Sequence, residues 1–344
     1  MAAAPPAPTV DVHAHLLIPA VEQAVAEHPD LAAHQEAERR RTGAGADPAA
    51  ARAFLAPIIG KLTDVRVRLR TMDDTGVDVQ VVSPSPNHYH PWADPGTATT
   101  VFRTAHAAIA EHCAAAPRRL VGLGLAPLQH PHLAVEALQD ALDAGLRGVE
   151  ISSYAGAVEL SDPGLEDFWA LAADRGAVVF LHPFGCSLDQ RLGDWYLANI
   201  VGQPVEHAVA LSHVIFSGVL DRHPGLRLLA AHGGGYLPTH LGRADRGWRV
   251  RPESRTCAEP PSSYASKLWY DTVVHSPAVL RHLVEVVGPD RVLLGSDFPF
   301  DMGSDDPVAE LAAAGFDEDT ATAIRGGTAV DLFGLAAVAA RPRS

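Results

Sequence analysis

The fold is constrained most by a regular alternation of short apolar runs with stretches of helix length. Eight runs rich in Val and Leu have the length of buried parallel strands. These runs extend over Val10 to His13, Val77 to Val82, Leu120 to Ala126, Gly148 to Ser152, Val178 to His182, Leu226 to His232, Leu268 to Val274 and Val292 to Asp297. The stretches of helix length between them include Thr99 to Ala116, Pro131 to Ala144, Asp162 to Arg175 and Pro277 to Val287. Eight strands that alternate with helices predict an α/β fold of the (β/α)8 TIM-like barrel type.

Most of the 344 residues fit one barrel domain. We expect a disordered start over residues 1–8, a single domain over 9–335 and a tail over 336–344. Residues 17 to about 62 are too many for a simple connection and have a helical composition, so they predict a helical insertion that caps the barrel mouth after strand 1. A second long stretch, residues 184–221, predicts a pocket wall or a subunit contact, and residues 317–333 predict two short closing helices.

The acidic balance limits the class of partner. The formal net charge is −14, whereas binding to nucleic acid or to an anionic membrane needs clustered Lys and Arg. A small molecule is therefore the expected partner, with no nucleic acid and no membrane. The three cysteines are odd in number and far apart, the N-terminus lacks the features of a secretory signal, and no run reaches the roughly 18 apolar residues of a membrane span. These features predict a protein of the reducing cytoplasm.

Four donors that suit a metal ion stand at strand ends in a fixed order. His13 and His15 are two residues apart in an extended segment, so both side chains point into the barrel mouth. His182 and Asp297 end two later strands, and barrel enzymes place their chemistry at these carboxyl ends. The set predicts one divalent metal ion. Zn²⁺ is the first candidate because the donors are nitrogen and carboxylate without thiolate, and Mn²⁺, Fe²⁺ and Co²⁺ are alternatives.

Each of these residues also has an ordinary interpretation. The pair His13 and His15 is compatible with a hydrogen-bonded surface pair, and His182 with a satisfied core histidine. Asp297 is compatible with a helix cap. For His182 and Asp297 taken alone, the ordinary interpretation is the better one. The metal site is favoured because all four residues stand at barrel strand ends, which would otherwise require several independent coincidences.

His232 ends another strand and is followed by three glycines, which let a substrate approach closely. We predict that His232 is a catalytic acid or base. The alternative is that it supports the metal ligands from behind or binds the metal as a fifth ligand. Asp297 is a second catalytic candidate, since a carboxylate on a metal can also hold or pass a proton. The sequence does not separate these two as the proton donor.

Several further residues are candidates for substrate binding. Arg243 offers a guanidinium that can pair with a substrate carboxylate, and the alternative is a solvated arginine on a helix face. His275 follows the seventh strand closely enough to reach the same mouth. Phe184, Trp195 and Phe298 are candidate aromatic walls of the pocket, with ordinary core packing as the alternative.

Five motifs resemble the amidohydrolase-related decarboxylase family (amidohydrolase 2), whose type member is aminocarboxymuconate-semialdehyde decarboxylase. They are VDVHAH, RLRTMDDTGVDVQVVS, FLHPF, PVEHAVALSHVIFSGVLDRHPGLRLLAAHGGGYLPTHLGR and YDTVVHSPAVLRHLVEVVGPDRVLLGSDFPFDMG, and they are spread over nearly the whole folded body. The resemblance implies a TIM-like barrel, a divalent metal held by the four donors named above, and proton transfer by His232. It also implies a homodimer in which Arg243 reaches the neighbouring subunit's site to bind the substrate carboxylate.

Two departures from the type enzyme bear on the substrate. Phe184 and Gly185 stand where that enzyme commonly has a Trp-Asp pair, and residues 199–204 stand where it has a tryptophan-rich stretch. In addition, only Arg52 lies near the position of its second substrate-binding arginine. The prediction is therefore a metal-dependent non-oxidative decarboxylase, a carboxy-lyase, for a hydroxybenzoate-like or aminocarboxymuconate-semialdehyde-like acid. The first alternative is a hydrolase that cleaves an amide, ester or lactone bond at the same site. A second alternative is a metal-bound scaffold without activity.

Overall fold

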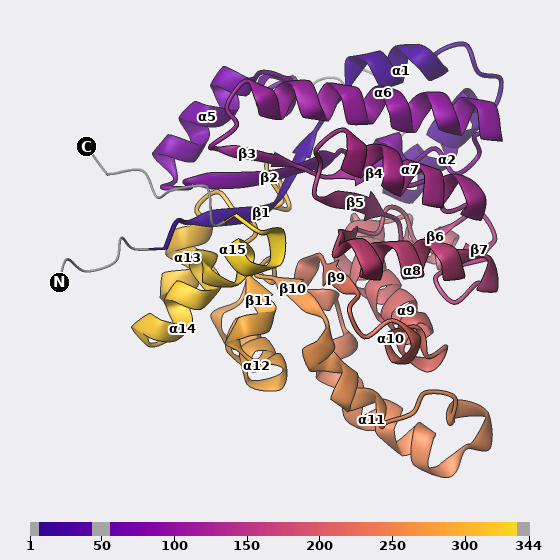
Figure 1. Ribbon diagram of the computed structural model, residues 1–344, viewed down its shortest axis with the longest axis vertical. Helices are drawn as coiled ribbons and strands as arrows, with labels where there is room; N and C mark the ends of the chain where they lie inside the picture. Colours follow the sequence, from indigo (N-terminus) through magenta and orange to yellow (C-terminus); the bar gives the residue numbers. More distant parts are fainter. Residues whose placement is uncertain (1–6, 43–55, 336–344) are drawn as a thin grey trace.

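The computed structural model describes residues 7–42 and 56–335, and its centre is a ring of parallel strands (Figure 1). The predicted disorder of residues 1–6, the tail 336–344 and the position of Arg52 lie outside the described residues. The barrel strands, of which β3 and β4 form one interrupted strand, are β1 (Val10–Leu16), β2 (Val79–Pro84), β3 (Leu120–Gly122), β4 (Gly124–Leu125), β5 (Gly148–Ile151), β8 (Val178–Leu181), β9 (Arg227–Ala230), β10 (Trp269–Asp271) and β11 (Val292–Leu293). A small antiparallel hairpin, β6 (Tyr154–Ala155) with β7 (Val158–Glu159), lies outside the ring.

Backbone hydrogen bonds close the ring of strands. Pairing runs in parallel from β1 through β2 to β3, and from β4 through β5, β8, β9 and β10 to β11. The gap between β3 and β4 is bridged where the Leu123 N–H donates to the Val82 carbonyl over 2.9 Å. The ends of the ring meet where the Val12 N–H donates to the Leu294 carbonyl over 2.9 Å. The predicted (β/α)8 barrel is thus confirmed.

Two layers of apolar side chains hold the barrel together. An inner cluster includes Val12, Phe180 and Leu229, all at most 1% exposed, and α15 closes it with Leu332 and Phe333. An outer cluster fills the space between the strands and the surrounding helices. Strands that are buried on both faces need continuous apolar runs, which is why the sequence pattern located them.

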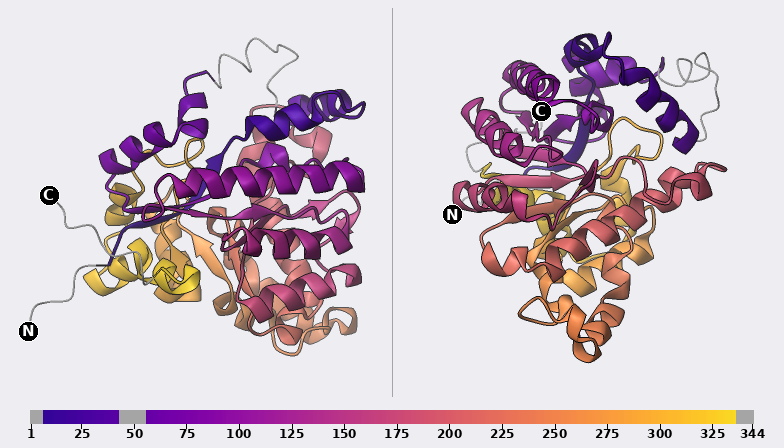
Figure 2. Two further views of the ribbon diagram at one scale, coloured as in Figure 1. Left: turned by 45° about the horizontal axis from the view of Figure 1, so that its top comes forward. Right: turned by 90° about the vertical axis from the view of Figure 1, so that its right-hand side faces the viewer.

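Helices cover the outside of the ring, and Figure 2 shows α6 to α8 stacked side by side. The long helices after the insertion, with their short companions, are α5 (Val65–Asp74), α6 (Pro95–Ala114), α7 (Pro131–Asp143), α8 (Glu166–Arg175), α9 (Gln203–Phe216), α10 (Val219–Arg222), α11 (Leu237–Val250), α12 (Pro277–Val287), α13 (Pro307–Ala313), α14 (Glu318–Thr322) and α15 (Thr328–Phe333). Single turns of 3-10 or π type are η1 (Pro86–His88), η2 (Pro163–Leu165), η3 (Asp189–Leu192), η4 (Ala198–Gly202), η5 (His232–Gly234), η6 (Pro252–Ser254), η7 (Pro261–Lys267), η8 (Pro289–Arg291) and η9 (Ala323–Gly327).

Two predicted helix starts are wrong by one turn for identifiable reasons. The α6 helix begins at Pro95 and not at Thr99, because the Asp94 side chain accepts from the Gly96 and Thr97 N–H groups and caps it there. The α8 helix begins at Glu166, because the Asp162 cap starts a 3-10 turn before it. No helix within 7–42 or 56–335 combines the length and apolar character needed to cross a membrane.

The helical insertion after strand 1 is present in its described part. It contains α1 (Pro19–Val25), α2 (Leu31–Thr42) and α4 (Ile59–Thr63). The α1 helix contacts α6, and α2 contacts η3 and η4 of the second long stretch. In Figure 1 the strand arrows point toward the side of the molecule where α2 lies. The two long segments of the sequence therefore meet at the carboxyl ends of the strands.

Candidate metal centre

A bulge in β1 places two histidines on the inner side of the barrel. The pairing of β1 with β2 shifts by one residue between Asp11 and Ala14, so the alternation of side chains restarts within the strand. His13 consequently contacts the inner Phe180 ring, with 5.0 Å between ring centroids. His15 follows two residues later, and both histidines are completely buried.

The donors from three parts of the chain meet at one point. The Nε2 atoms of His13 and His15 are 3.1 Å apart, and Asp297 Oδ1 lies 3.3 Å and 3.1 Å from them. The His182 ring lies 5.0 Å from that of His13 and 4.9 Å from that of His15, between centroids. One donor atom from each of these four residues lies within 4.8 Å of all the others. The predicted ligand set is thus brought together by the fold.

The hydrogen-bond partners of the Nδ1 atoms of His13 and His15 indicate which ring nitrogen is left to bind a metal. His13 Nδ1 lies 2.6 Å from the Asp271 carboxylate, and His15 Nδ1 lies 3.2 Å from the Pro84 carbonyl. Each partner can only accept, so each Nδ1 carries a proton, and each ring presents a bare Nε2 whenever it holds no second proton. Two lone pairs and a carboxylate oxygen then converge with no donor between them, which is stable only around a positive charge.

The electrostatics of the cluster also favour a cation. Burial raises the pKa of Asp297, but the neighbouring histidines outweigh it and hold the pKa well below its ordinary value. Burial lowers the pKa of His13, but the charges of Asp297 and Asp271 outweigh it and raise the pKa to about 10. A bound proton or a bound metal ion can neutralise this excess of negative charge, and the two compete for the same donor atoms.

His182 provides an independent test of whether a metal fits. Its side chain is buried, and within the described part of the chain neither ring nitrogen has a hydrogen-bond partner. Burial lowers its pKa well below the ordinary value, so the ring is neutral. A buried ring with two unsatisfied nitrogens is costly unless one of them binds a ligand. The three histidines and Asp297 therefore fit a divalent metal ion.

His232 lies on the other side of the Asp297 carboxylate. Its Nε2 is 3.5 Å from Asp297 Oδ2, while Oδ1 faces the ligand histidines. His232 and Asp297 both have positive backbone φ angles, 52° and 58°, which non-glycine residues adopt mainly where the surrounding structure holds them. His232, the predicted acid or base, thus lies beside Oδ2 of Asp297, which is the oxygen that does not face the ligand histidines.

Asp271 is a residue of the site that the sequence analysis missed. Its carboxylate accepts a hydrogen bond from His13 Nδ1–H and also from the backbone N–H groups of Gly233 and Val273. One completely buried side chain therefore orients a metal ligand and holds the turn that carries His232. No role was predicted for Asp271, because it lies within the predicted strand Leu268 to Val274, whereas β10 ends at Asp271.

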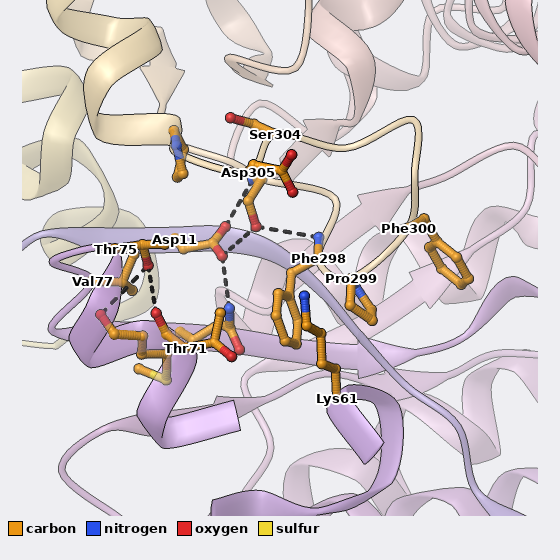
Figure 3. Close-up of a pocket in the computed structure, with 14 residues that line it drawn as sticks. Asp11, Lys61, Thr71, Thr75, Val77, Phe298, Pro299, Phe300, Ser304 and Asp305 are labelled. Atoms are coloured by element: carbon orange, nitrogen blue, oxygen red, sulfur yellow. Dashed lines mark hydrogen bonds between the residues drawn. The ribbon is translucent and has the colours of Figure 1, made fainter. Parts of the chain in front are cut away.

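A second buried network holds β1 against the Asp297 turn, and Figure 3 shows it beside a cavity of about 60 Å³. Asp11 accepts from the Ser296 N–H and hydroxyl and from the Gln80 amide. Arg68, completely buried, donates to Gln80 and to the His15 carbonyl. Arg68 is the first residue of the motif RLRTMDDTGVDVQVVS, and no role was predicted for it.

Two aromatic residues on the last loop face different ways. Phe298, predicted as a pocket wall, lies beside Lys61 in Figure 3, and its ring lies 5.1 Å from the Arg68 guanidinium. Phe300, which was not predicted, contacts the His15 ring at 5.3 Å. The structure thus brings Phe300 to the metal cluster, and a role of Phe298 at the substrate stays a prediction.

Phe184 lines a separate cavity of about 200 Å³ next to the cluster. Tyr89 and Leu128 line it as well. The Tyr89 hydroxyl lies 2.6 Å from Glu150 Oε1 and 2.8 Å from the His182 carbonyl, which links this cavity to a candidate ligand. The cavity is the described space that best suits the organic part of a substrate.

Three predicted residues lie outside this cluster. Arg243 is exposed on α11, a helix that leads away from the barrel in Figure 1, and it forms no hydrogen bond or ion pair with the described residues. His275 is exposed just past β10. Trp195 is 83% exposed, so it is not a pocket wall within one chain. Roles of Arg243 and His275 in substrate binding stay predictions.

The family model for amidohydrolases matches residues 10–335. The chain belongs to the amidohydrolase family. The match includes every candidate ligand and His232, and it covers nearly all of the described barrel.

A similar protein sequence and two similar solved structures all carry the names of decarboxylases. The chain is 33% identical over 286 residues to the 2-amino-3-carboxymuconate-6-semialdehyde decarboxylase of Dictyostelium discoideum, covering 82% of this chain and 80% of that one. The solved 5-carboxyvanillate decarboxylase of Sphingomonas paucimobilis has a TM-score of 0.82 and 26% identity, covering 95% and 99% of the two chains. The corresponding enzyme of Novosphingobium aromaticivorans, solved with manganese and a nitrobenzoic acid, has a TM-score of 0.83 at 19% identity, covering 95% and 96%.

Proposed function

We propose that this enzyme is a metal-dependent non-oxidative decarboxylase of an aromatic or unsaturated carboxylic acid. The observation that carries the proposal is the convergence of Nε2 of His13, Nε2 of His15 and Oδ1 of Asp297, with His232 beside Oδ2 of Asp297. The names of the similar enzymes, which act on aminocarboxymuconate semialdehyde and carboxyvanillate, support this reaction class. The substrate is expected to be a small acid with an oxygen or amino group near the carboxylate.

His13, His15, His182 and Asp297 would hold the metal ion. When bound, the ion supplies a Lewis acid that polarises a substrate oxygen and can lower the pKa of a coordinated water. The donor set favours Zn²⁺, and the manganese reported with a similar solved enzyme makes Mn²⁺ the second candidate.

The residues of the chain account for the proton that decarboxylation requires. The bond between the ring or alkene carbon and the carboxylate breaks, carbon dioxide leaves, and the carbon keeps the electron pair and needs a proton. His232 Nε2 is the candidate donor to that carbon, its proton is replaced from water, and Asp297 Oδ2 orients the ring before the transfer. Asp297 itself is the alternative donor.

The position of Arg243 supports a dimeric active site. An exposed guanidinium on a helix that leads away from its own barrel has no partner in the described part of its own chain. We therefore propose a homodimer in which Arg243 of one subunit binds the substrate carboxylate in the other subunit. Phe184 would form the apolar wall in the cavity of about 200 Å³.

Product analysis tests the reaction class. The metal-loaded enzyme is offered a panel of hydroxybenzoates, aminobenzoates and muconate semialdehydes, and carbon dioxide and product mass are measured. Release of carbon dioxide with a product short of one carboxyl group is the expected result. Turnover confined to a parallel set of amides, esters and lactones would replace the proposal with a hydrolase that uses the same site.

A further inference from the structure

His232 has a second buried neighbour besides Asp297. The Nε2 atom of His207 lies 3.2 Å from Nδ1 of His232, and the two rings are inclined by 73°. His207 is completely buried on α9, a helix separate from the barrel strands that carry the metal ligands. Both ring nitrogens of His232 are thus engaged, Nδ1 by His207 and Nε2 by Asp297.

A glycine makes this approach of α9 possible. A Cβ atom at Gly235 would lie 2.3 Å from the Pro204 carbonyl oxygen and 2.9 Å from the His207 Cβ. The φ angle of Gly235 is also +61°, which favours glycine. The third glycine after His232 therefore lets the start of α9 pack directly on the turn, which brings His207 within reach of His232.

The surroundings of His207 determine which of the two rings donates. Within the described part of the chain, Nδ1 of His207 has no hydrogen-bond partner. A buried N–H without an acceptor is rarer and costlier than an acceptor without a donor. His207 therefore carries its proton on Nε2 and donates it to Nδ1 of His232. Burial also lowers the pKa of His207 well below its ordinary value, so its ring is neutral and has a single proton.

We propose that His207 is a positioning residue that fixes His232 with its proton on Nε2, the nitrogen that faces Asp297 and the substrate. Neutral imidazole carries one proton on one of its two nitrogens, and a donor at Nδ1 forces that proton to Nε2. The proton on Nε2 therefore faces Asp297 and the substrate before the reaction begins, and a proton given to the substrate carbon is replaced by one taken up from water. The inference rests on the proposed function only for the use of this proton, since the tautomer itself does not depend on the reaction.

Nitrogen NMR of the full-length enzyme loaded with Zn²⁺ tests the tautomer directly. Histidine labelled with ¹⁵N distinguishes protonated from bare ring nitrogens, and the His232 signals are those lost in His232→Asn. The expected spectrum has a protonated Nε2 and a bare Nδ1 on His232. In His207→Gln, whose amide can still donate, this pattern persists. In His207→Glu, whose ionised carboxylate can only accept, a proton appears on Nδ1.

Kinetics separate positioning from a structural role. His207→Leu should lower kcat by about 10- to 100-fold with little change in KM, as expected when the partner of a catalytic group is removed. His207→Gln should recover most of the loss, and the matched control His213→Gln on the same helix should equal the unmodified enzyme. His213 bonds to Ser161 and does not reach the site.

Two results would overturn the proposal. One is a proton on Nδ1 of His232 in the unmodified enzyme, and the other is equal losses of kcat in His207→Gln and His207→Leu. If His207→Leu does not fold, the spectra of the Gln and Glu variants decide. If the panel of acids is not turned over at all, the proposed function fails, while the spectra still decide the tautomer.

Discussion

His182 and His232 differ in what their loss should remove. His182 offers two unsatisfied buried nitrogens to the cluster, whereas His232 faces only one oxygen of Asp297. We expect His182→Ala to lose bound metal and turnover together. His232→Ala should keep the metal and lower kcat by about 10²- to 10⁴-fold, the range for general acid catalysis. Metal content by mass spectrometry, measured beside carbon dioxide release, checks both. Full activity of His232→Ala would remove it from the mechanism.

Asp271 should influence metal affinity although it binds no metal. Asp271→Asn keeps the size of the side chain and removes the charge that orients His13 and strengthens it as a donor. Partners of this kind typically change metal affinity or activity by about 10- to 100-fold, and we expect a weaker affinity of that order in competition with a chelator. Asp290→Asn, an exposed carboxylate before β11, is the control. Equal affinities in the two variants would show that the contact is only structural.

At the scale of single elements, two glycines should respond in opposite ways to alanine. At Gly235 an added Cβ meets Pro204 and His207, and φ is positive, so Gly235→Ala should destabilise the fold by about 1–3 kcal/mol. At Gly242, within α11, nothing lies within 4 Å of an added Cβ. Gly242→Ala should stabilise by about 0.5–1 kcal/mol through helix propensity. Urea unfolding measures both, and a neutral Gly235→Ala would contradict the close packing of α9.

Some elements and site residues could be predicted from the sequence, and others could not. Buried parallel strands require continuous apolar runs, so the strands and the donors at their ends, such as His182 and Asp297, could be predicted without coordinates. Asp271 was missed because the apolar run continues past it to Val274, so it lies inside the predicted seventh strand and not at its end. His207 belongs to the same motif as His232, but no role was predicted for it, because it lies within α9 and 25 residues before His232. Only the packing of that helix on Gly235 makes it part of the site.

At the scale of the whole molecule, a dimeric site predicts complementation between two inactive variants. A dimer of one His232→Ala subunit and one Arg243→Ala subunit has one site with both residues intact. Random pairing during co-expression makes half of the dimers mixed, so about one quarter of the unmodified activity per subunit should return. Each variant expressed alone is the control. A co-expressed mixture as inactive as its parents would place Arg243 outside the neighbouring site.

The central claim is that decarboxylation depends on one ion held by His13, His15, His182 and Asp297. The most direct test is titration of the metal-depleted enzyme with Zn²⁺ or Mn²⁺ while carbon dioxide release from an active member of the acid panel is measured. The account predicts no release without metal and a linear rise that ends at about one ion per chain, consistent with a single-ion site. Undiminished release from metal-depleted enzyme, or a rise in the His182→Ala variant equal to that of the unmodified enzyme, would contradict it.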